Sequence, residues 1–186
     1  MGPTGPTGRP GNKAVPAMRA IAGEGVTLEP QMATHAGELY AVLRDPALYT
    51  FADDKEPASE QTLADRLSRL ESRRSPDGTQ HWLNWIVRSG DGELVGYVQA
   101  TVGRGGRAEI AYIIGRHHWR RGYATAACTA MLNELATMYG VTEVVATLDP
   151  ANTASLALLR KLGLTLAHEG PARQEVTYAL DLISVK

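Results

Sequence analysis

The hydrophobic pattern changes its period at residues 75–78, and this change restricts the fold more than any other feature. Leucines in residues 59–74 recur at helical spacing, whereas apolar and polar residues alternate in residues 82–88. Two more strand-like runs follow, and glycine-containing turn signals separate all three. The runs and turns are, in order, residues 82–88, Asp91-Gly92, 94–102, Gly105-Gly106 and 107–115. Three successive strands joined by tight turns predict an antiparallel meander.

Helical and strand patterns alternate on both sides of this meander. The remaining strands are expected at residues 26–29, 144–148, 164–168 and 175–182, and the helices at 35–44, 59–74, 123–139 and 152–161. A β-α-β crossover over residues 107–149 then lies in an otherwise antiparallel sheet. The order predicts a mixed α/β fold, with a mostly antiparallel six- to seven-stranded sheet flanked by about four helices.

Composition limits the domain organisation and the classes of partner. The chain has 186 residues, which suits one domain at residues 24–186 preceded by a Gly/Pro-rich disordered arm at residues 1–23. A net charge of −1 provides no basic field for nucleic acid, and no apolar run is long enough for a bilayer. The single cysteine, Cys128, cannot form an internal disulfide, and its helical position predicts a buried side chain. We therefore expect a cytoplasmic protein that binds neither nucleic acid nor membrane.

The segment of residues 116–124 carries the clearest functional signal. It joins a strand to a long helix, and the first turn of a helix has backbone N–H groups without intrahelical partners. These groups and the helix dipole form an anion site, and Gly122 lets a ligand approach the backbone closely. Arg116, Arg120 and Arg121 add positive charge. The segment therefore indicates a phosphate or pyrophosphate site, and the alternative is a plain turn with solvated arginines.

Three motifs resemble the GNAT acetyltransferase superfamily. Residues 119–125 read Trp-Arg-Arg-Gly-Tyr-Ala-Thr and look like that family's pyrophosphate loop, Gln/Arg-x-x-Gly-x-Gly/Ala, with Trp119 in place of Gln/Arg as in the Rim-type ribosomal-protein N-acetyltransferases. Residues 152–164 are similar to the family's Asn-x-x-Ser followed by Lys-x-Gly-Phe, with Leu164 replacing the phenylalanine. Residues 109–112 resemble a Glu-Ile-Gly-Tyr strand. The motifs occur in the family's order, and the resemblance covers residues 25–182.

This resemblance implies a fold, a co-substrate and a set of binding residues. The fourth and fifth strands of the family splay apart, and the pantetheine arm of acetyl-CoA lies between them. Backbone groups of Ile113 and Ile114 would bind the pantetheine amides, and Asn152 would face the same arm. The remaining cofactor-binding residues implied by the loop motif are Trp119, Arg120, Arg121, Gly122, Tyr123, Ala124 and Thr125. No metal is implied.

Direct acetyl transfer to an amine requires removal of a proton from the amine and protonation of the departing thiolate. Glu109 is the candidate base, acting through water, and the alternative is a structural carboxylate paired with Arg107 or Arg88. Ser155 is the candidate donor to sulfur, as well as a cofactor-binding residue, and the alternative is a helix-capping role. Rival candidates for the base are Glu169 and Glu175, near the last strands, and His117 and His118 are weaker ones.

The acceptor is expected across the sheet from the cofactor, near residues 46–58, 59–74 and 168–174. Acidic side chains there would attract a cationic amine and aromatic side chains would form an apolar wall; these are Asp53, Asp54, Glu56, Tyr49, Phe51, Trp82 and Trp85. The acceptor is either a protein N-terminus or a small amine. Two alternatives remain open, a non-catalytic acyl-CoA-binding module of the same fold and an unrelated phosphate-binding protein. Either a monomer or a homodimer fits the sequence.

Overall fold

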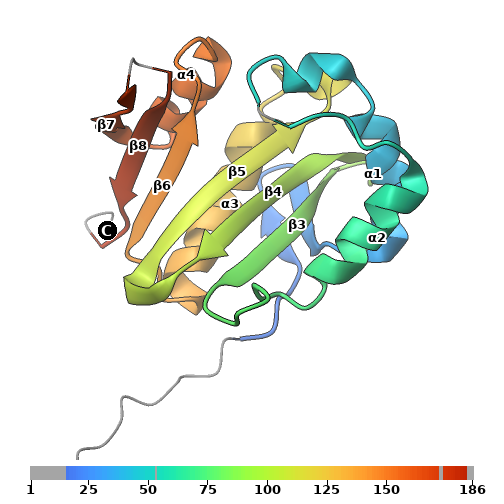
Figure 1. Ribbon diagram of the computed structural model, residues 1–186, viewed down its shortest axis with the longest axis horizontal. Coiled ribbons are helices and arrows are strands. Elements are labelled where there is room, and N and C mark those ends of the chain that lie inside the picture. The colour runs from blue at the N-terminus through green and yellow to red at the C-terminus, as the bar shows by residue number, and fades with distance from the viewer. Residues whose placement is uncertain (1–15, 53, 172–173, 184–186) are drawn as a thin grey trace, which may run out of the picture.

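The computed structural model describes residues 16–52, 54–171 and 174–183, and its centre is one mixed sheet of eight strands (Figure 1). The strands lie in the order β1-β2-β3-β4-β5-β6-β8-β7. Their bounds are β1 Ile21–Gly23, β2 Val26–Pro30, β3 His81–Ser89, β4 Leu94–Val102, β5 Arg107–Ile114, β6 Glu143–Leu148, β7 Thr165–Glu169 and β8 Val176–Asp181. The expected α/β class is confirmed, with one or two strands more than expected.

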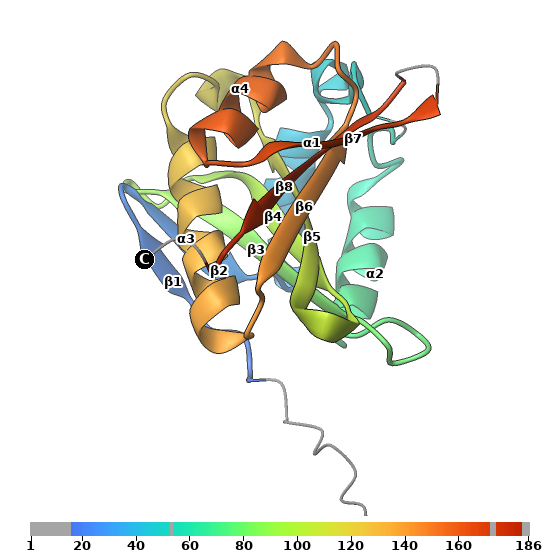
Figure 2. The ribbon, with the colours of Figure 1, turned by 90° about the vertical axis from the view of Figure 1, so that its left-hand side faces the viewer.

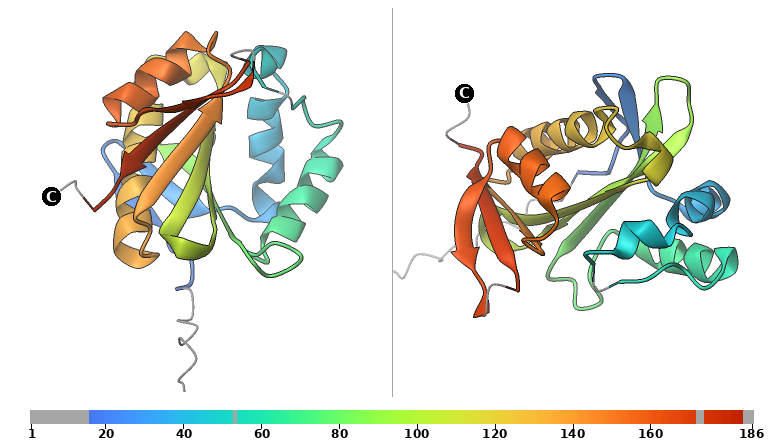
Figure 3. Two further views of the ribbon diagram at one scale, coloured as in Figure 1. Left: turned by 60° about the vertical axis from the view of Figure 1, so that its left-hand side comes forward. Right: turned by 90° about the horizontal axis from the view of Figure 1, so that it is seen from above.

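Helices cover the sheet on both faces (Figures 2 and 3). Their bounds are α1 Ala36–Leu43, α2 Glu60–Leu70, α3 Tyr123–Met138 and α4 Thr153–Lys161. Helix α3 packs on one face through buried residues such as Met131 and Leu135, and these belong to the larger core cluster. Helices α1 and α2 pack on the opposite face in a second cluster with Ile86 and Leu94. The sheet is therefore a central layer between two helical layers.

The meander is confirmed, and it contains one irregularity next to the site. Strands β3, β4 and β5 pair antiparallel in sequence order. Val87 lies opposite Gly96 whereas Arg88 lies opposite Leu94, so Val95 is an extra residue that forms a bulge in β4. A Cβ on Gly96 would lie 2.1 Å from the carbonyl oxygen of Ile113, so only glycine fits where β4 and β5 approach each other.

Strands β5 and β6 diverge, and this opens the sheet at one end. They pair in parallel over only three positions, Arg107–Glu109 with Glu143–Val145, although β5 has eight residues and β6 has six. Beyond this point β6 pairs only with β8 among the described strands. Figure 1 shows the two ribbons separating toward the carboxyl ends of both strands. The splayed central strands implied by the resemblance are therefore present.

The amino-terminal boundary differs from the expectation. Residues 21–23, which were expected to belong to a disordered arm, form edge strand β1 and pair with Val26–Leu28 of β2. Arg19 makes two hydrogen bonds, of 2.9 and 2.8 Å, to the carboxylate of Glu134 in α3, and its carbonyl oxygen accepts the indole N–H of Trp85. These partners hold the segment against the core, so a domain start at residue 24 is too late. The first 15 residues of the expected arm lie outside the described residues.

Helix α2 also ends earlier than the expected residue 74. Its last helical residue is Leu70, and Arg73 has a left-handed φ of +57°. Arg74 then forms an isolated antiparallel bridge with His81 at the start of β3. The helix was expected to extend to residue 74 because charged residues continue to that position, but the chain turns after Leu70 to enter the meander.

Candidate active site

A cavity of about 750 Å³ lies beside the carboxyl end of β5, where β6 has diverged from β5 to leave a V-shaped gap; none of the residues that line the cavity belongs to β6. Its walls come from the end of β5, the following loop, the first turn of α3, one face of α4 and residues 47–51. The expected cofactor-binding residues that line it are Ile113, Ile114, Trp119, Arg120, Gly122, Tyr123, Ala124, Thr125, Asn152 and Ser155. Of that set only Arg121 is outside the lining. Two motifs with 26 residues between Thr125 and Asn152 thus meet at one site.

The wall at the start of α3 is suited to an anion. Gly122 is the N-cap of α3 with φ +84°, and no side chain caps this end of the helix. The first N–H groups of α3 therefore remain available, and the helix dipole adds to their attraction for negative charge. A Cβ placed on Gly122 meets no atom within 4 Å, so the backbone at this position is open to a ligand. Arg120, with φ +62°, is the second residue of this loop in the left-handed backbone conformation.

Trp119 fixes the loop to the strand that precedes it. Its indole Nε1 donates a 2.6 Å hydrogen bond to the carbonyl oxygen of Ile114, while 47% of the residue remains exposed. The bond joins the first motif position to the last residue of β5. A loop held at both ends loses less conformational freedom when a ligand binds.

The α4 wall carries the candidate proton donor. The amide oxygen of Asn152 accepts the backbone N–H of Ser155 at 3.1 Å, so Asn152 caps α4 as expected. The Ser155 hydroxyl has no hydrogen-bond partner among the described residues, so its side chain does not cap the helix. Across the V, the Tyr112 hydroxyl donates to the Ser155 carbonyl oxygen at 3.4 Å, and burial raises the pKa of Tyr112 to about 12.

The structure separates the candidate base from the cavity. Glu109 is exposed on β5 at the closed end of the V, opposite Val145, and it is not part of the cavity wall. Its structural alternative fails, because Arg107 pairs with Glu143 and Arg88 pairs with Glu29 and Glu38. The rival candidates Glu169 and Glu175 and the weaker candidate His117 are also outside this wall, whereas His118 is part of it.

Only some of the residues expected to surround the acceptor lie at the cavity. Phe51 lines the cavity just after the 3-10 helix Pro46–Tyr49. The Tyr49 hydroxyl is bonded to the carbonyl oxygen of Leu43, and Asp54 lies 3.8 Å from Arg66. Asp53 lies outside the described residues, and Glu56 and half-buried Trp82 are absent from the wall.

Trp85 does not belong to the acceptor wall, and its expected role there is wrong. Its side chain is 0% exposed and points into the α3 core rather than toward α1 and α2. The alternation along β3 assigns odd positions to the α3 face, and the sequence did not indicate which face would hold the acceptor. Cys128 is also 0% exposed, as expected, and burial raises the pKa of its thiol to about 12.

The sequence reasoning missed one charged residue of the site. Lys161 lines the cavity from the last turn of α4, where a cation can balance a phosphate. Ala154, Leu158 and Lys161 follow one another at helical spacing, so they share a face with the motif residues Asn152 and Ser155. This helical spacing was the sequence signal that could have identified Lys161 as a residue of the site.

Neither a metal-binding cluster nor a membrane-spanning helix occurs among the residues that the structure describes. Within these residues, no cluster of three or more histidine, cysteine or acidic side chains has the geometry to hold a metal ion. Over the same residues, no helix has the length and apolar character needed to cross a membrane.

Comparison with known proteins identifies one family. The model of the Acetyltransferase (GNAT) domain matches residues 26–165. An uncharacterized N-acetyltransferase p20 of Bacillus licheniformis is 26% identical over 147 residues, covering 78% of this chain and 82% of that protein.

Solved structures share the fold at low identity. Mycobacterium smegmatis RimJ in complex with CoA-disulfide superposes with a TM-score of 0.76 at 20% identity, covering 89% of this chain and 87% of that one. RimL, a ribosomal L7/L12 alpha-N-protein acetyltransferase in complex with coenzyme A, gives 0.76 at 17% identity over 88% and 98% of the two chains. A GNAT-family acetyltransferase from Bacillus anthracis gives 0.72 at 17% identity over 87% and 98%.

Proposed function

The chain belongs to the GNAT acetyltransferase family, and from this membership we propose that it transfers an acetyl group from acetyl-CoA to a primary amine. The observation that carries the proposal is the cavity at the open end of the V. It joins a helix N-terminus suited to a pyrophosphate to a gap between two strands suited to an extended arm. Two structures of the same fold were solved with CoA-derived ligands.

The binding residues follow from the walls of the cavity. The N–H groups at the start of α3 would hold the pyrophosphate, with Gly122 leaving the backbone uncovered. The edge of β5 at Ile113 and Ile114 would bond the pantetheine amides, because β6 has diverged and leaves this edge unpaired. Arg120 and Lys161 would balance the phosphate charge.

Acetyl transfer involves two proton transfers, because the attacking amine loses a proton and the departing sulfur gains one. The neutral amine attacks the thioester carbon, the C–N bond forms and the C–S bond breaks. The amine proton leaves through water to a carboxylate, for which we propose Glu109. The Ser155 hydroxyl, which has no hydrogen-bond partner among the described residues, protonates the departing thiolate and is itself reprotonated from solvent.

The acceptor is a protein N-terminus or a small amine. Residues 47–51 line the cavity, so an acceptor reaching the thioester would pass beside Phe51. RimL, whose name includes alpha-N-protein acetyltransferase, shares the fold and supports the first class. We also propose that the protein works in the cytoplasm, since a single unpaired thiol suits a reducing compartment.

Calorimetry with acetyl-CoA, followed by a thiol-release assay over a panel of amines and N-terminal peptides, tests the proposal. We expect saturable binding and release of CoA with at least one amine, whose mass increases by one acetyl group. Binding without turnover over the whole panel would favour the non-catalytic acyl-CoA-binding module. Failure to bind any CoA species would contradict both functions.

A further inference from the structure

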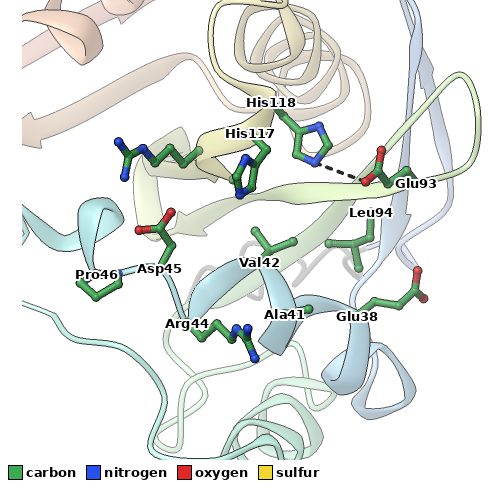
Figure 4. Close-up of a pocket in the computed structure, with 12 residues that line it drawn as sticks. Glu38, Ala41, Val42, Arg44, Asp45, Pro46, Glu93, Leu94, His117 and His118 are labelled. Carbon is green, nitrogen blue, oxygen red and sulfur yellow. Dashed lines mark ion pairs between the residues drawn. The ribbon is translucent and has the colours of Figure 1, made fainter.

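A second cavity, of about 550 Å³, lies between helix α1 and residues 115–118, beside the cofactor cavity. Figure 4 shows Val42 and Leu94 facing His117 across it. Together with Ala41, these two aliphatic side chains form an apolar floor. This volume lies within the range of small-molecule sites.

Charged groups of both signs surround the apolar floor. Asp45 lies at one end and Glu93 at the other (Figure 4). Arg44 and Arg116 also line the cavity, and neither has an acidic partner among the described residues. A ligand with two positive charges would meet these arginines, and a ligand with two negative charges would meet the carboxylates. The cavity therefore favours a ligand that carries one charge of each sign.

The remaining acidic group of the wall is already neutralised. Glu38 accepts two hydrogen bonds from Arg88, of 2.9 and 3.0 Å, and this pairing lowers the pKa of Glu38. One oxygen of Asp45 accepts the N–H of Ala47 at 3.0 Å, and its second oxygen has no hydrogen-bond partner among the described residues. Without the Glu38–Arg88 pair, the wall holds two carboxylates and two guanidinium groups, which is electrically balanced.

We propose that this cavity binds a small zwitterion, specifically a free α-amino acid with an aliphatic side chain. The ammonium group pairs with a carboxylate of the wall, the carboxylate pairs with a guanidinium group, and the side chain covers the floor of Ala41, Val42 and Leu94. Because the ligand carries one positive and one negative charge, it pairs with a carboxylate and with a guanidinium group of the wall, and neither ligand charge is left without an opposite charge.

The site is coupled to the cofactor cavity through shared residues. Arg116 and His118 line both cavities. The His118 ring lies edge-on to the ring of Tyr123, the first residue of α3, with 6.1 Å between centroids, and its Nε2 is 3.5 Å from Glu93. A ligand that draws Glu93 toward its ammonium group therefore acts on the start of α3. This coupling rests on the proposed function, whereas zwitterion binding does not.

Calorimetry on the full chain with three matched ligands tests the charge requirement. Leucine carries both charges, leucinamide lacks the carboxylate, and 4-methylpentanoate lacks the ammonium group. We expect saturable binding of leucine, and affinities at least about tenfold lower for the other two, since each loses one ion pair. Equal binding of all three, or no binding of leucine, would overturn the proposal.

Two variants localise the binding. Ala41→Trp fills the cavity from an exposed position on α1 and is expected to abolish leucine binding while the affinity for CoA is retained. Ser68→Trp adds the same side chain to an exposed position of α2 outside the cavity and is expected to leave leucine binding unchanged. If Ala41→Trp does not fold, Glu93→Gln serves instead and should weaken leucine binding about tenfold. Unchanged leucine affinity in a folded cavity variant would overturn the assignment.

The coupling is measured with CoA rather than acetyl-CoA, so that leucine cannot act as an acetyl acceptor. We expect saturating leucine to change the dissociation constant of CoA, and CoA to change that of leucine by the same factor. Unchanged CoA affinity would overturn the coupling alone. Absence of CoA binding would contradict the proposed function and leave the zwitterion result to be judged by the matched ligands.

Discussion

At the scale of single residues, the roles of Ser155 and Glu109 separate once their surroundings are known. Both are motif residues, and the sequence left a structural alternative open for each. Ser155 lines the cavity and its hydroxyl has no hydrogen-bond partner among the described residues, whereas Asn152 caps the helix. Glu109 does not pair with Arg107 or Arg88, which was its structural alternative, but it lies where β5 and β6 are still paired, away from the cavity. A proton donor at the cavity is thus better supported than a base.

Ser155→Ala tests the donor. The substitution removes the hydroxyl and leaves the capping bond from the Ser155 backbone to Asn152 in place. We expect kcat to fall on the order of 100-fold, with little change in the dissociation constant of acetyl-CoA or in thermal stability. Steady-state kinetics, calorimetry and a melting curve give the three values. An unchanged kcat would assign the proton to water and remove Ser155 from the mechanism.

Cys128 provides a test of the core. Its thiol is 0% exposed, and burial raises its pKa to about 12, so the reactive thiolate forms in the native state only in strongly alkaline solution. We expect no labelling by a maleimide at neutral pH in the folded protein and stoichiometric labelling after unfolding. Rapid labelling of the native protein would contradict the packing of α3 on the sheet.

At the scale of elements, the type and order of the helices and strands could be predicted from periodicity, except for β1. The strand expected at residues 94–102 and the helix expected at 123–139 agree with β4 and α3 to within one residue. Strand β1 was missed because three residues are too few for a period and follow a Gly/Pro-rich run. The bulge at Val95 and the early end of α2 depend on pairing between distant segments, which a local pattern does not contain.

The candidate site could be predicted where it consists of one continuous segment. Gly122 and its neighbours were identified from a strand-to-helix junction, and of these residues all but Arg121 line the cavity. The acceptor wall was not predictable in the same way, because its residues come from separate elements and their faces depend on register. Trp85 shows the failure, since it lies on the opposite face of the sheet. Lys161 shows a missed case, since its helical spacing was visible but was not used.

The loop before α3 is tested by a pair of substitutions at Gly122. Its φ of +84° disfavours side chains generally, but asparagine and aspartate both tolerate this region and have nearly the same shape. We expect Gly122→Asp to bind acetyl-CoA about tenfold to a hundredfold more weakly than Gly122→Asn, because it places a negative charge at the anion site. Calorimetry gives both constants. Equal affinity for the two variants would remove the loop from the cofactor site.

At the scale of the whole molecule, the segment before β2 is part of the fold. Arg19 and strand β1 join α3 and β3, which are far apart in the sequence. The ion pair covers Glu134, which is 4% exposed, and the carbonyl of Arg19 is the hydrogen-bond acceptor for fully buried Trp85. Loss of this segment leaves two buried polar groups without partners.

Truncation tests this role of the segment. A chain that begins at residue 24 is expected to lose about 2 kcal/mol or more of unfolding free energy, because each unsatisfied group costs about 1–3 kcal/mol. A chain that begins at residue 16 keeps every contact described above and is the matched control. Urea unfolding gives both values. Equal stability of the two chains would show that strand β1 does not contribute to the fold.

The central claim is that the gap between the diverging strands β5 and β6 holds the pantetheine arm of acetyl-CoA. The most direct measurement is a crystal structure of the protein with CoA. The account predicts electron density for the arm along Ile113 and Ile114, with the pyrophosphate at the first N–H groups of α3. Density for CoA elsewhere on the molecule, with the gap between β5 and β6 filled by side chains or water, would contradict it.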